Sequence, residues 1–594
     1  MSQTSGRQQA RPSPQASVLS PGIDPIVLEV LWNRLLSVTN EQQAALMRTA
    51  FSTIVRESQD LACGVFDTQG NMIAQSETGT PGHINAMATC MRHFMRAYPP
   101  ETLEPGDVLI TNDPWMTAGQ INDITIVTPI FRGGQIVAYF ANTCHMADIG
   151  GRILSAEARE VYEEGLYIPI TKLFFRGERN EELFKIIRAN VRTPDEVEGD
   201  LYAMTSCNDV GGARLLEFMD EFGFDTIDAL AEAIISRSEQ AMRQAIARIP
   251  DGVYENELWS DGFEGPVVIK ARVSVEGDEM TVDHAGSSPQ SRYGINVVMN
   301  YTHAYTSFAV KCAISPDVPH NEGAFRPVHV TAPPGSILNA QYPAPVAARH
   351  LIGHFLPNLL FGALAEAMPD RFMAEGAASI WITVFRGERS NGEPFTFTLF
   401  QCGGTGARPN KDGLDNTGFP SGVAGVPAEV IENLSPLVMT RREVKTDSGG
   451  PGRYRGGCGQ ITTIRCHSGR SWSMSGMYDR TKFPAQGLLG GKPGLPGDFT
   501  LSTGERPNPK QQILNEPNAE ATMTLPGGGG YFSPLERHPE KVLEDVVDGY
   551  VSLEAAERDY GVKILCSRRP DEQISVPEHY RIDWEATKRL RSGT

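Results

Sequence analysis

Hydrophobic and polar positions near the start of the chain alternate with the period of a helix. Apolar residues recur at three- and four-residue intervals from Ile26 to about Ile54. They follow Asp24, a favoured N-cap residue, and Pro25, which suits the first helical turn. We therefore expect order to begin with a long helix, preceded by a disordered polar tail over 1–22.

Short apolar runs separated by turn residues predict strands and hairpins after this helix. A first hairpin has one strand at Leu61–Phe66 and a return that begins at Met72, with a helix over His83–Tyr98. A second hairpin joins the runs 124–131 and 135–145 through a Gly-Gly turn. Its strands are almost wholly apolar, which predicts burial on both faces.

Further along the chain, the pattern changes from helical to strand-like. The spacing predicts that residues 157–250 are mainly helical, whereas alternation with a period of two begins at about 251. Residues 376–594 are expected to be mostly strand and turn. Further helices are predicted over 301–313, 350–367, 540–548 and 553–559.

These patterns predict an α+β protein, a large multi-layered mixed α/β subunit. Its N-terminal half is helix-rich, its C-terminal half is β-rich, and the elements do not alternate as in a Rossmann domain. Beyond the tail we expect an N-terminal α/β region (23–250), a mixed α/β middle region (251–440) and a β-rich, Gly-rich C-terminal region (441–594), with approximate boundaries.

Composition and charge exclude several classes of partner. The chain has 594 residues with 53 basic and 72 acidic side chains, a formal net charge of −19. This excess of acid argues against a nucleic acid or an anionic membrane, because both attract Lys and Arg. No run approaches the roughly 20 apolar residues of a membrane span, and the N-terminus lacks the apolar core of a secretory signal. We expect a cytoplasmic protein with nine scattered, reduced cysteines.

Two glycine-rich stretches are similar to nucleotide loops only superficially. In GLLGGKPG (487–494) the glycines are too closely spaced, and Pro493 stands where a P-loop has Ser or Thr. PGGGGY (526–531) has no lysine directly after it. The GxSxG motif of serine hydrolases is also absent. We therefore expect turns at both stretches, no nucleotide site on this chain and no serine hydrolase activity.

His350 and His354 are four residues apart, so a helix would place both imidazoles on one face. Such a pair can bind zinc, but no acidic residue lies close to it in the sequence. We favour packing and hydrogen bonding inside a helix-rich layer for both histidines.

The N-terminal region also holds a set of donors suited to a metal. Asp123 begins the first strand of the second hairpin and His145 ends the second strand, so the two residues can meet. Asp60, just before a neighbouring strand, would add a second carboxylate. Two carboxylates and an imidazole suit zinc, manganese or iron(II), although aspartates at strand starts are often purely structural.

Several motifs, in this order, are similar to those of the hydantoinase B/oxoprolinase family. The resemblance runs from about Asp24 to about Ile564, so we expect one interlocked protein unit. Its carriers are RESQDLACGVFD (56–67), NDPW (112–115), HMADIGGR (145–152), EVYEEGLYIP (160–169), NAQYPAPVAAR (339–349), DSGGPGRYRGGCGQ (447–460), GLLGGKPG (487–494) and the stretch 525–552.

The resemblance implies a hetero-oligomeric enzyme. An A-type component, either a separate chain or a fused half, binds ATP and phosphorylates the carbonyl or enolate oxygen of a small-molecule substrate. The B-type component then opens a ring, or carboxylates the substrate, at a site with a divalent metal. Phosphorylation is chemically reasonable because an unstrained cyclic amide resists hydrolysis until its oxygen is activated.

The resemblance also implies a set of metal ligands, Asp60, Gln120, Asp123 and His145. This chain departs from the family at Gln120, where metal-binding members have His. A Gln carbonyl is a harder and weaker donor than imidazole, so the change shifts metal preference toward manganese or magnesium, weakens binding or leaves the site empty. No catalytic base is assigned; Asp148, His83 and Asp113 are neighbouring candidates with structural alternatives in capping and loop hydrogen bonds.

The glycine motif DSGGPGRYRGG is interpreted structurally first, as needing backbone angles that a side chain would hinder. Its Arg453 and Arg455 either pair with acids or bind an anionic intermediate.

Three functions follow from these observations. The first is a B-type subunit of an ATP-dependent cyclic amidohydrolase, acting on a hydantoin-, oxoproline- or lactam-like ring. The second is a subunit of an acetone/acetophenone-type, biotin-independent carboxylase. The third is a catalytically silent scaffold whose metal site has decayed at Gln120.

Overall fold

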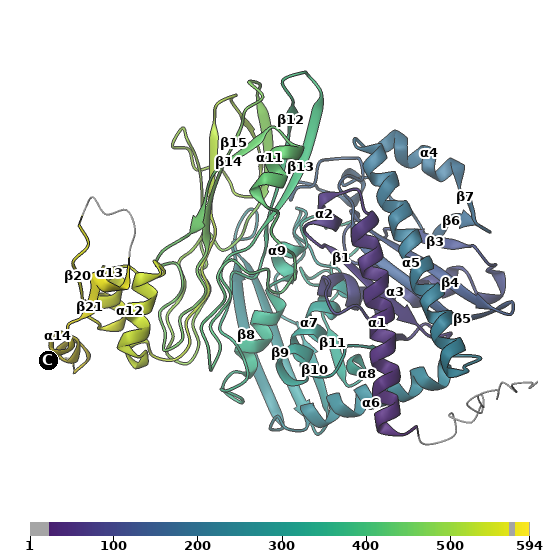
Figure 1. The fold of residues 1–594 in the computed structure, drawn as a ribbon, viewed down its shortest axis with the longest axis horizontal. Coiled ribbons are helices and arrows are strands. Elements are labelled where there is room, and N and C mark those ends of the chain that lie inside the picture. Colours follow the sequence, from purple (N-terminus) through teal and green to yellow (C-terminus); the bar gives the residue numbers. More distant parts are fainter. Residues whose placement is uncertain (1–22, 570–575, 593–594) are drawn as a thin grey trace, which may run out of the picture.

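A seven-stranded sheet forms the centre of the N-terminal part of the chain (Figure 1). The computed structural model describes residues 23–569 and 576–592, so the predicted tail over 1–22 lies outside the described residues. The strand order is β2-β1-β5-β4-β3-β6-β7. The strands are β1 Leu61–Phe66, β2 Met72–Gln75, β3 Val108–Thr111, β4 Asp123–Arg132, β5 Gln135–His145, β6 Thr171–Phe175 and β7 Glu178–Arg179.

Helices cover both faces of this sheet. The long helices α1 (Pro25–Thr49) and α5 (Pro194–Phe222) pack on one face, and α3 (Pro81–Ala97) packs on the other. Adjacent residues of β1 show the alternation, because Val65 packs with α1 while Phe66 packs with α3. The sheet is therefore buried on both faces, as its apolar strands predicted.

A second layer lies beyond α3. Helix α7 (Met299–Ile314) packs on α3, and α10 (Leu356–Leu364) packs between α7 and a four-stranded sheet of order β11-β10-β9-β8. The strands are β8 Gly252–Ser260, β9 Val267–Glu276, β10 Glu279–Asp283 and β11 Val328–Thr331. The remaining helices of the chain before the sandwich are α2 Thr53–Arg56, α4 Glu181–Asn190, α6 Asp228–Ile246, α8 Glu322–Phe325 and α9 His350–Gly353; of these, α2 contacts α1 and α4 contacts α5.

Two four-stranded sheets form a sandwich after α10. Large apolar side chains such as Trp381, Trp472 and Met523 fill the space between them. One sheet contains β13 Pro394–Gln401, β12 Trp381–Glu388, β16 Trp472–Met477 and β18 Gln512–Asn515. The other contains β14 Leu437–Val444, β15 Gln460–Cys466, β19 Glu520–Thr524 and β17 Asp498–Leu501, with α11 Ala428–Leu434 against β14.

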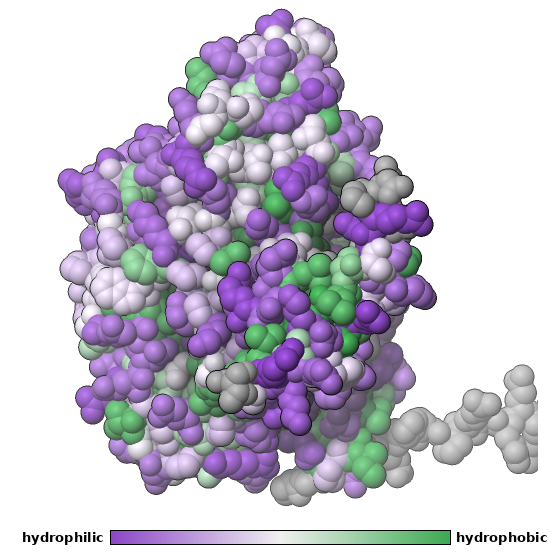
Figure 2. Space-filling model, turned by 90° about the vertical axis from the view of Figure 1, so that its left-hand side faces the viewer, coloured by the Kyte–Doolittle hydropathy of each residue, from purple (hydrophilic) through white to green (hydrophobic). Residues whose placement is uncertain are grey.

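The chain ends in a small helical unit with its own apolar core. Figure 2 looks at this end of the molecule and shows a mostly hydrophilic surface with small, scattered apolar patches. Within the described ranges, no helix is both long and apolar enough to cross a membrane. The elements of the unit are α12 Pro539–Val547, α13 Leu553–Tyr560, β20 Ile564–Cys566, β21 Tyr580–Ile582 and α14 Trp584–Ser592.

Extended, glycine-rich segments connect the sandwich to this unit (Figure 1). We call segments 403–406, 449–459, 487–495 and 526–530 the glycine bundle. Main-chain hydrogen bonds join them directly: Gly457 donates to the Thr405 carbonyl over 2.8 Å, and Gly528 donates to that of Gly457 over 2.9 Å. The segments lie so close that a Cβ on Gly528 would be 1.9 Å from the Thr405 oxygen.

The predicted fold class is confirmed, as are both hairpins and the Asp24 cap, whose carboxylate accepts from the amide of Ile26 over 2.9 Å. The helical prediction over 157–250 is wrong in its first part, because β6 and β7 extend the large sheet there. Helix α14 was not predicted. The predicted boundary at 440 falls inside β14, whose neighbours in the sandwich come from further along the chain.

The glycine motifs have a different physical basis from the one predicted. The glycines of DSGGPGRYRGG all lack the positive φ values that would require glycine, and neighbouring main chains at close range exclude a side chain instead. The stretch 526–530 is extended rather than a turn, because its backbone pairs with other segments of the glycine bundle. Residues 488–491 do form a turn, closed by a 2.9 Å hydrogen bond.

Candidate functional site

The second hairpin brings Asp123 and His145 together at one end of the large sheet. They are direct partners in the register of β4 and β5, and Leu61 of β1 pairs with Cys144 on the other side of β5. Asp60, one residue before β1, therefore lies beside His145, whose amide donates to the Asp60 carbonyl over 3.2 Å. The antiparallel geometry fixes the place of both aspartates.

Gln120 completes a tight cluster of side-chain atoms with these residues. Its Nε2 is 2.6 Å from Asp123 Oδ1 and 2.7 Å from His145 Nδ1, and those two atoms are 3.0 Å apart. The Asp60 carboxylate is the outlying member, with Oδ2 3.9 Å from His145 Nδ1. The structure thus brings together all four residues named as metal ligands, in a buried position.

The first turns of α3 add Thr80 and His83 to the cluster. The Thr80 hydroxyl, at the N-cap, donates to Asp60 Oδ1 over 2.7 Å. The Nε2 of His83 lies 3.0 Å from Asp123 Oδ2, and its Nδ1 lies 3.6 Å from Asp60 Oδ1. His83 therefore bridges the two carboxylates.

Arg349 is the charged residue at the site that the sequence interpretation missed. Its guanidinium donates to Asp123 Oδ2 and to the Ala118 carbonyl, and it lies 4.1 Å from the centre of the Tyr301 ring. It is the last residue of the motif NAQYPAPVAAR, so membership of that motif was the signal that could have identified it.

Charge balance explains how two carboxylates are tolerated in the interior. Burial opposes ionisation of Asp123, but Arg349 and His83 hold its pKa well below its usual range. Burial likewise disfavours the charged form of His83, yet Asp123 and Asp60 outweigh it and raise the pKa of His83. The site is therefore a buried network of paired charges.

The two histidines of the RHLIGHF stretch lie next to this network. His354 Nε2 is 3.1 Å from the hydroxyls of both Tyr301 and Tyr305, which supports the predicted packing and hydrogen bonding. His350 differs, because it is 3% exposed and neither ring nitrogen has a hydrogen-bond partner. Burial lowers the pKa of His350 well below its usual range, so it is a neutral imidazole close to His145.

Asp113 and Asp148 have structural partners instead. Asp113 accepts from the amide of Trp115 over 2.9 Å and from the Tyr167 hydroxyl. Asp148 pairs with Arg192 over 2.6 Å. Both therefore stabilise the loops in which they lie.

Arg453 and Arg455 lie far along the chain, in the glycine bundle. Arg455 is buried and pairs with Asp415 and Asp545, at 3.3 and 3.5 Å. Arg453 is half-exposed, with Glu536 at 3.8 Å. Arg455 thus has acids as partners, and the anion-binding role of both residues stays a prediction.

Comparison with known proteins decides the family. The hydantoinase B/oxoprolinase profile matches residues 24–534. The chain belongs to this family. It is 31% identical to the B subunit of the putative D-/L-hydantoinase from Pseudomonas sp. (strain NS671), covering 96% of this chain and 98% of that one. It is also 31% identical to the beta chain of the caprolactamase from Pseudomonas jessenii, covering 93% and 98%.

Two solved structures share the fold of this chain. The crystal structure of the ATP-dependent caprolactamase from Pseudomonas jessenii matches with a TM-score of 0.86 and 28% identity, covering 96% of this chain and 99% of that one. A nucleotide-free acetone carboxylase structure matches with a TM-score of 0.85 over 96% of this chain and 83% of the other. Its 19% identity shows the shared fold alone.

The arrangement in this family member fits a metal only if Gln120 takes part. Within the described ranges 23–569 and 576–592, no group of three or more His, Cys, Asp or Glu side chains is arranged to hold a metal ion. With the amide included, three donor groups are 2.6–3.0 Å apart. Adjacent ligands of an octahedral ion with bonds of about 2.1 Å are about 3 Å apart. The Gln120 nitrogen Nε2 faces Asp123 and His145, and a rotation of the amide by half a turn would point its oxygen Oε1 toward them instead. With that oxygen as a ligand, the donor set fits a divalent ion that accepts oxygen ligands.

Proposed function

We propose that this chain is the metal-containing B-type subunit of an ATP-dependent cyclic amidohydrolase. It would open a cyclic amide, of the hydantoin, oxoproline or lactam type, after a partner A-type subunit has phosphorylated it. The observation that carries the proposal is the buried cluster of Asp60, Gln120, Asp123 and His145 in a member of this family. Near full-length similarity to one chain of a hydantoinase and one chain of a caprolactamase supports the substrate class.

The chemistry would divide between the metal and the residues of this chain. When bound, a divalent ion supplies a Lewis acid and a water of lowered pKa. Asp60, Gln120, Asp123 and His145 would hold it. Arg349 and His83 contact the Asp123 oxygen on the far side from Gln120 and would fix the orientation of that carboxylate.

ATP is assigned to the partner rather than to this chain. The two glycine-rich stretches that were candidates for phosphate loops belong to the glycine bundle, where their amides pair with protein carbonyls. An A-type subunit would therefore make the activated amide, and the enzyme would be a hetero-oligomer. We place it in the cytoplasm, in keeping with nine cysteines that are all free.

A carboxylase subunit is the second candidate, favoured by the fold shared with acetone carboxylase. The same metal cluster would then serve an activated ketone. Reaction type, rather than fold, separates the two candidates.

Reconstitution tests the proposal. The chain is co-purified with its A-type partner and incubated with ATP, Mn²⁺ or Zn²⁺, and hydantoin, 5-oxoproline or caprolactam. Mass spectrometry should detect the ring-opened acid, and Asp123→Asn should abolish it. Asp225→Asn, at an exposed position, should leave it unchanged. Bicarbonate-dependent carboxylation of a ketone without ring opening would establish the carboxylase. If neither reaction occurs with any A-type partner, the silent scaffold is the remaining function.

A further inference from the structure

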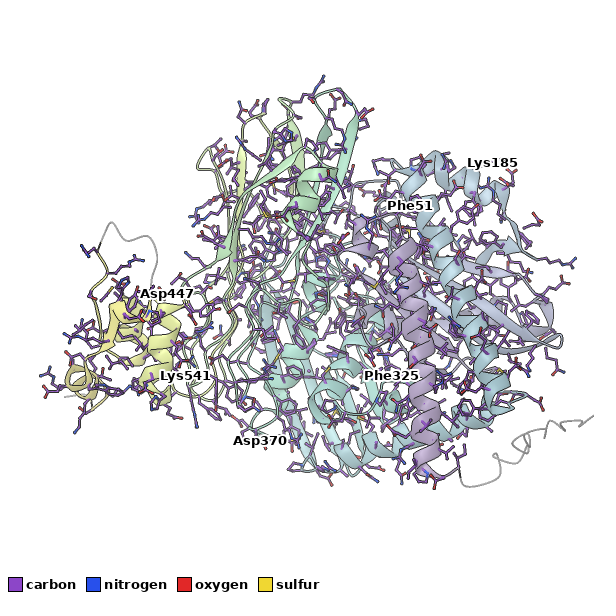
Figure 3. All side chains as sticks on the ribbon, viewed as in Figure 1. Phe51, Lys185, Phe325, Asp370, Asp447 and Lys541 are labelled. Carbon is purple, nitrogen blue, oxygen red and sulfur yellow. The ribbon has the colours of Figure 1, made fainter. Side chains whose placement is uncertain are left out.

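The N-terminal layer and the sandwich enclose an arginine-rich pocket of about 520 Å³. One wall consists of α2 and the turn before α5; the other is the β12–β13 hairpin. Figure 1 shows α2 beside this hairpin, and Figure 3 labels Phe51, one of the lining residues, at the same junction. The volume is in the ordinary range for small-molecule sites.

Arginines dominate the charged lining of the arginine-rich pocket. Arg56, Arg192, Arg386 and Arg389 face it, against one carboxylate, Glu196. This positive surface is unusual in a chain of formal net charge −19. Because the overall field repels anions, a local cluster of guanidinium groups is what an anionic ligand would need.

Two of these arginines have no acid to neutralise them. Arg56 pairs with Glu57 at 3.1 Å, and Arg192 pairs with Asp148. In the described part of the chain, Arg386 forms no ion pair, and the Arg389 guanidinium donates to the Leu434 carbonyl rather than to a carboxylate. The hairpin therefore presents two uncompensated, forked donors, the geometry that binds phosphoryl oxygens in pairs.

Other groups on the walls complement an oxyanion. Arg386 is the cross-strand partner of Thr396, so the two side chains share a face of the hairpin. Burial raises the pKa of Glu196 to about 7, with a further contribution from Asp200. The single acid of the lining therefore carries only part of its negative charge at neutral pH.

A small second cavity lies between the arginine-rich pocket and His145 of the buried cluster. This cavity of about 10 Å³, enough for one water-sized group, is lined by His145 and Asn122. Four residues line both cavities: Ala147, Arg192, Thr396 and Thr398. The arginine-rich pocket is therefore adjacent to the small cavity that His145 lines.

We infer that the arginine-rich pocket binds the phosphoryl group of a small-molecule substrate, with Arg386 and Arg389 as its principal donors. The inference rests on the proposed function, because it names where the activated, anionic amide is held before its reacting end meets the cluster at His145. The ligand class is a small phosphoryl monoester or enol phosphate, not a carboxylate of single charge.

A binding measurement tests the pocket without any turnover. The full chain is treated with chelator, so that no metal can hold the probe, and titrated with methyl phosphate by calorimetry. Arg386→Gln and the double variant Arg386→Gln/Arg389→Gln should weaken binding at least fivefold and twentyfold. Arg506→Gln, which removes an arginine that is 71% exposed outside the pocket, should bind as the wild type does. Arg389→Gln also removes the hydrogen bond to the Leu434 carbonyl, which can disturb the hairpin. The single variant Arg386→Gln keeps that bond, so it tests the pocket independently.

Several results would overturn the inference. Binding that is unchanged in both pocket variants places the anion elsewhere, and acetate binding as tightly as methyl phosphate removes the phosphoryl preference. With the reconstituted complex, the double variant should form at least twice as much ADP per ring opened as the wild type, because the phosphorylated amide is held less tightly and is lost before ring opening. An unchanged ratio of ADP to ring-opened product would contradict a binding role. Failure of the complex to open any cyclic amide, with pocket-dependent phosphate binding intact, would refute the proposed function and not the pocket.

Discussion

Arg349 and Asp123 form a buried ion pair between residues 226 positions apart in the chain. The guanidinium also lies over the Tyr301 ring, which belongs to α7. The pair therefore fixes the hairpin of the large sheet to the second layer of helices, at the candidate metal site.

Removing the cation should destabilise the protein strongly. Arg349→Met leaves the buried Asp123 carboxylate with only His83 as a counter-charge, so the free energy of unfolding should fall by up to about 3–5 kcal/mol. Urea denaturation measures the change. The double variant Arg349→Met/Asp123→Asn should recover part of it, and Arg506→Met should cost about 1 kcal/mol or less. Equal losses in the single and double variants would show that the charge pair is not the cause.

Gln120→His should tighten metal binding. Imidazole is a better ligand for zinc than an amide oxygen. The side chain of residue 120 already reaches the cluster, because Gln120 Nε2 lies 2.7 Å from His145 Nδ1. We expect Kd for Zn²⁺ to fall about tenfold or more, the scale on which changes around metal sites act. Calorimetry measures it, with Gln511→His as the control for an added surface histidine. An unchanged affinity would mean that residue 120 does not ligate the ion.

The glycine bundle should not tolerate a single added methyl group at its centre. The Cβ of Gly528→Ala would meet the Thr405 carbonyl oxygen at 1.9 Å, and that oxygen belongs to a backbone that is itself hydrogen-bonded. Overpacking of this kind typically costs about 1–3 kcal/mol, so soluble yield and thermal midpoint should both fall. Gly265→Ala is the matched control, because its Cβ meets nothing within 4 Å.

Stability should depend on pH through Glu164. Its Oε1 accepts from the amides of Val346 and Ala347, and burial raises its pKa to about 8. The folded protein thus favours the protonated form of Glu164. The stabilisation that this protonation gives is complete below about pH 4.3, the pKa of Glu in the unfolded chain, and it is lost as the pH rises to about 8. Glu164→Gln should match the wild type near pH 4 and exceed it progressively, by up to about 1.4 kcal/mol per pH unit, until pH 8.

Urea denaturation at pH 4.5, 6, 7.5 and 9 checks this dependence, with the exposed Glu101→Gln as the control. Parallel pH profiles for Glu164→Gln and the wild type would rule out a protonated Glu164 in the folded state.

The sequence pattern predicted the part of the site that depends on residues close together in the chain. An antiparallel hairpin brings its ends together, so the meeting of Asp123 and His145 followed from strand pattern alone. The family resemblance added Gln120. Arg349 could not be placed in this way, because no periodic rule relates a residue after β11 to a strand more than two hundred residues earlier.

The differences between the predicted and the observed fold have physical causes as well. The segment 171–179 contains short runs that only become strands because β3 offers an unpaired edge. The hydropathy pattern could not predict the glycine bundle, since pattern rules depend on side chains and glycine is the commonest residue in these segments. Their close packing arises from partners that lie far away in the sequence.

The glycine bundle also bears on how slowly the protein exchanges its amide hydrogens. Gly404, Gly457 and Gly528 are buried and donate to carbonyls of other segments, although none belongs to a helix or strand. Such amides exchange with deuterium only when the surrounding structure opens. These apparent loops should therefore be protected as long as the sandwich strands are, and form a rigid connection between the sandwich and the C-terminal helices.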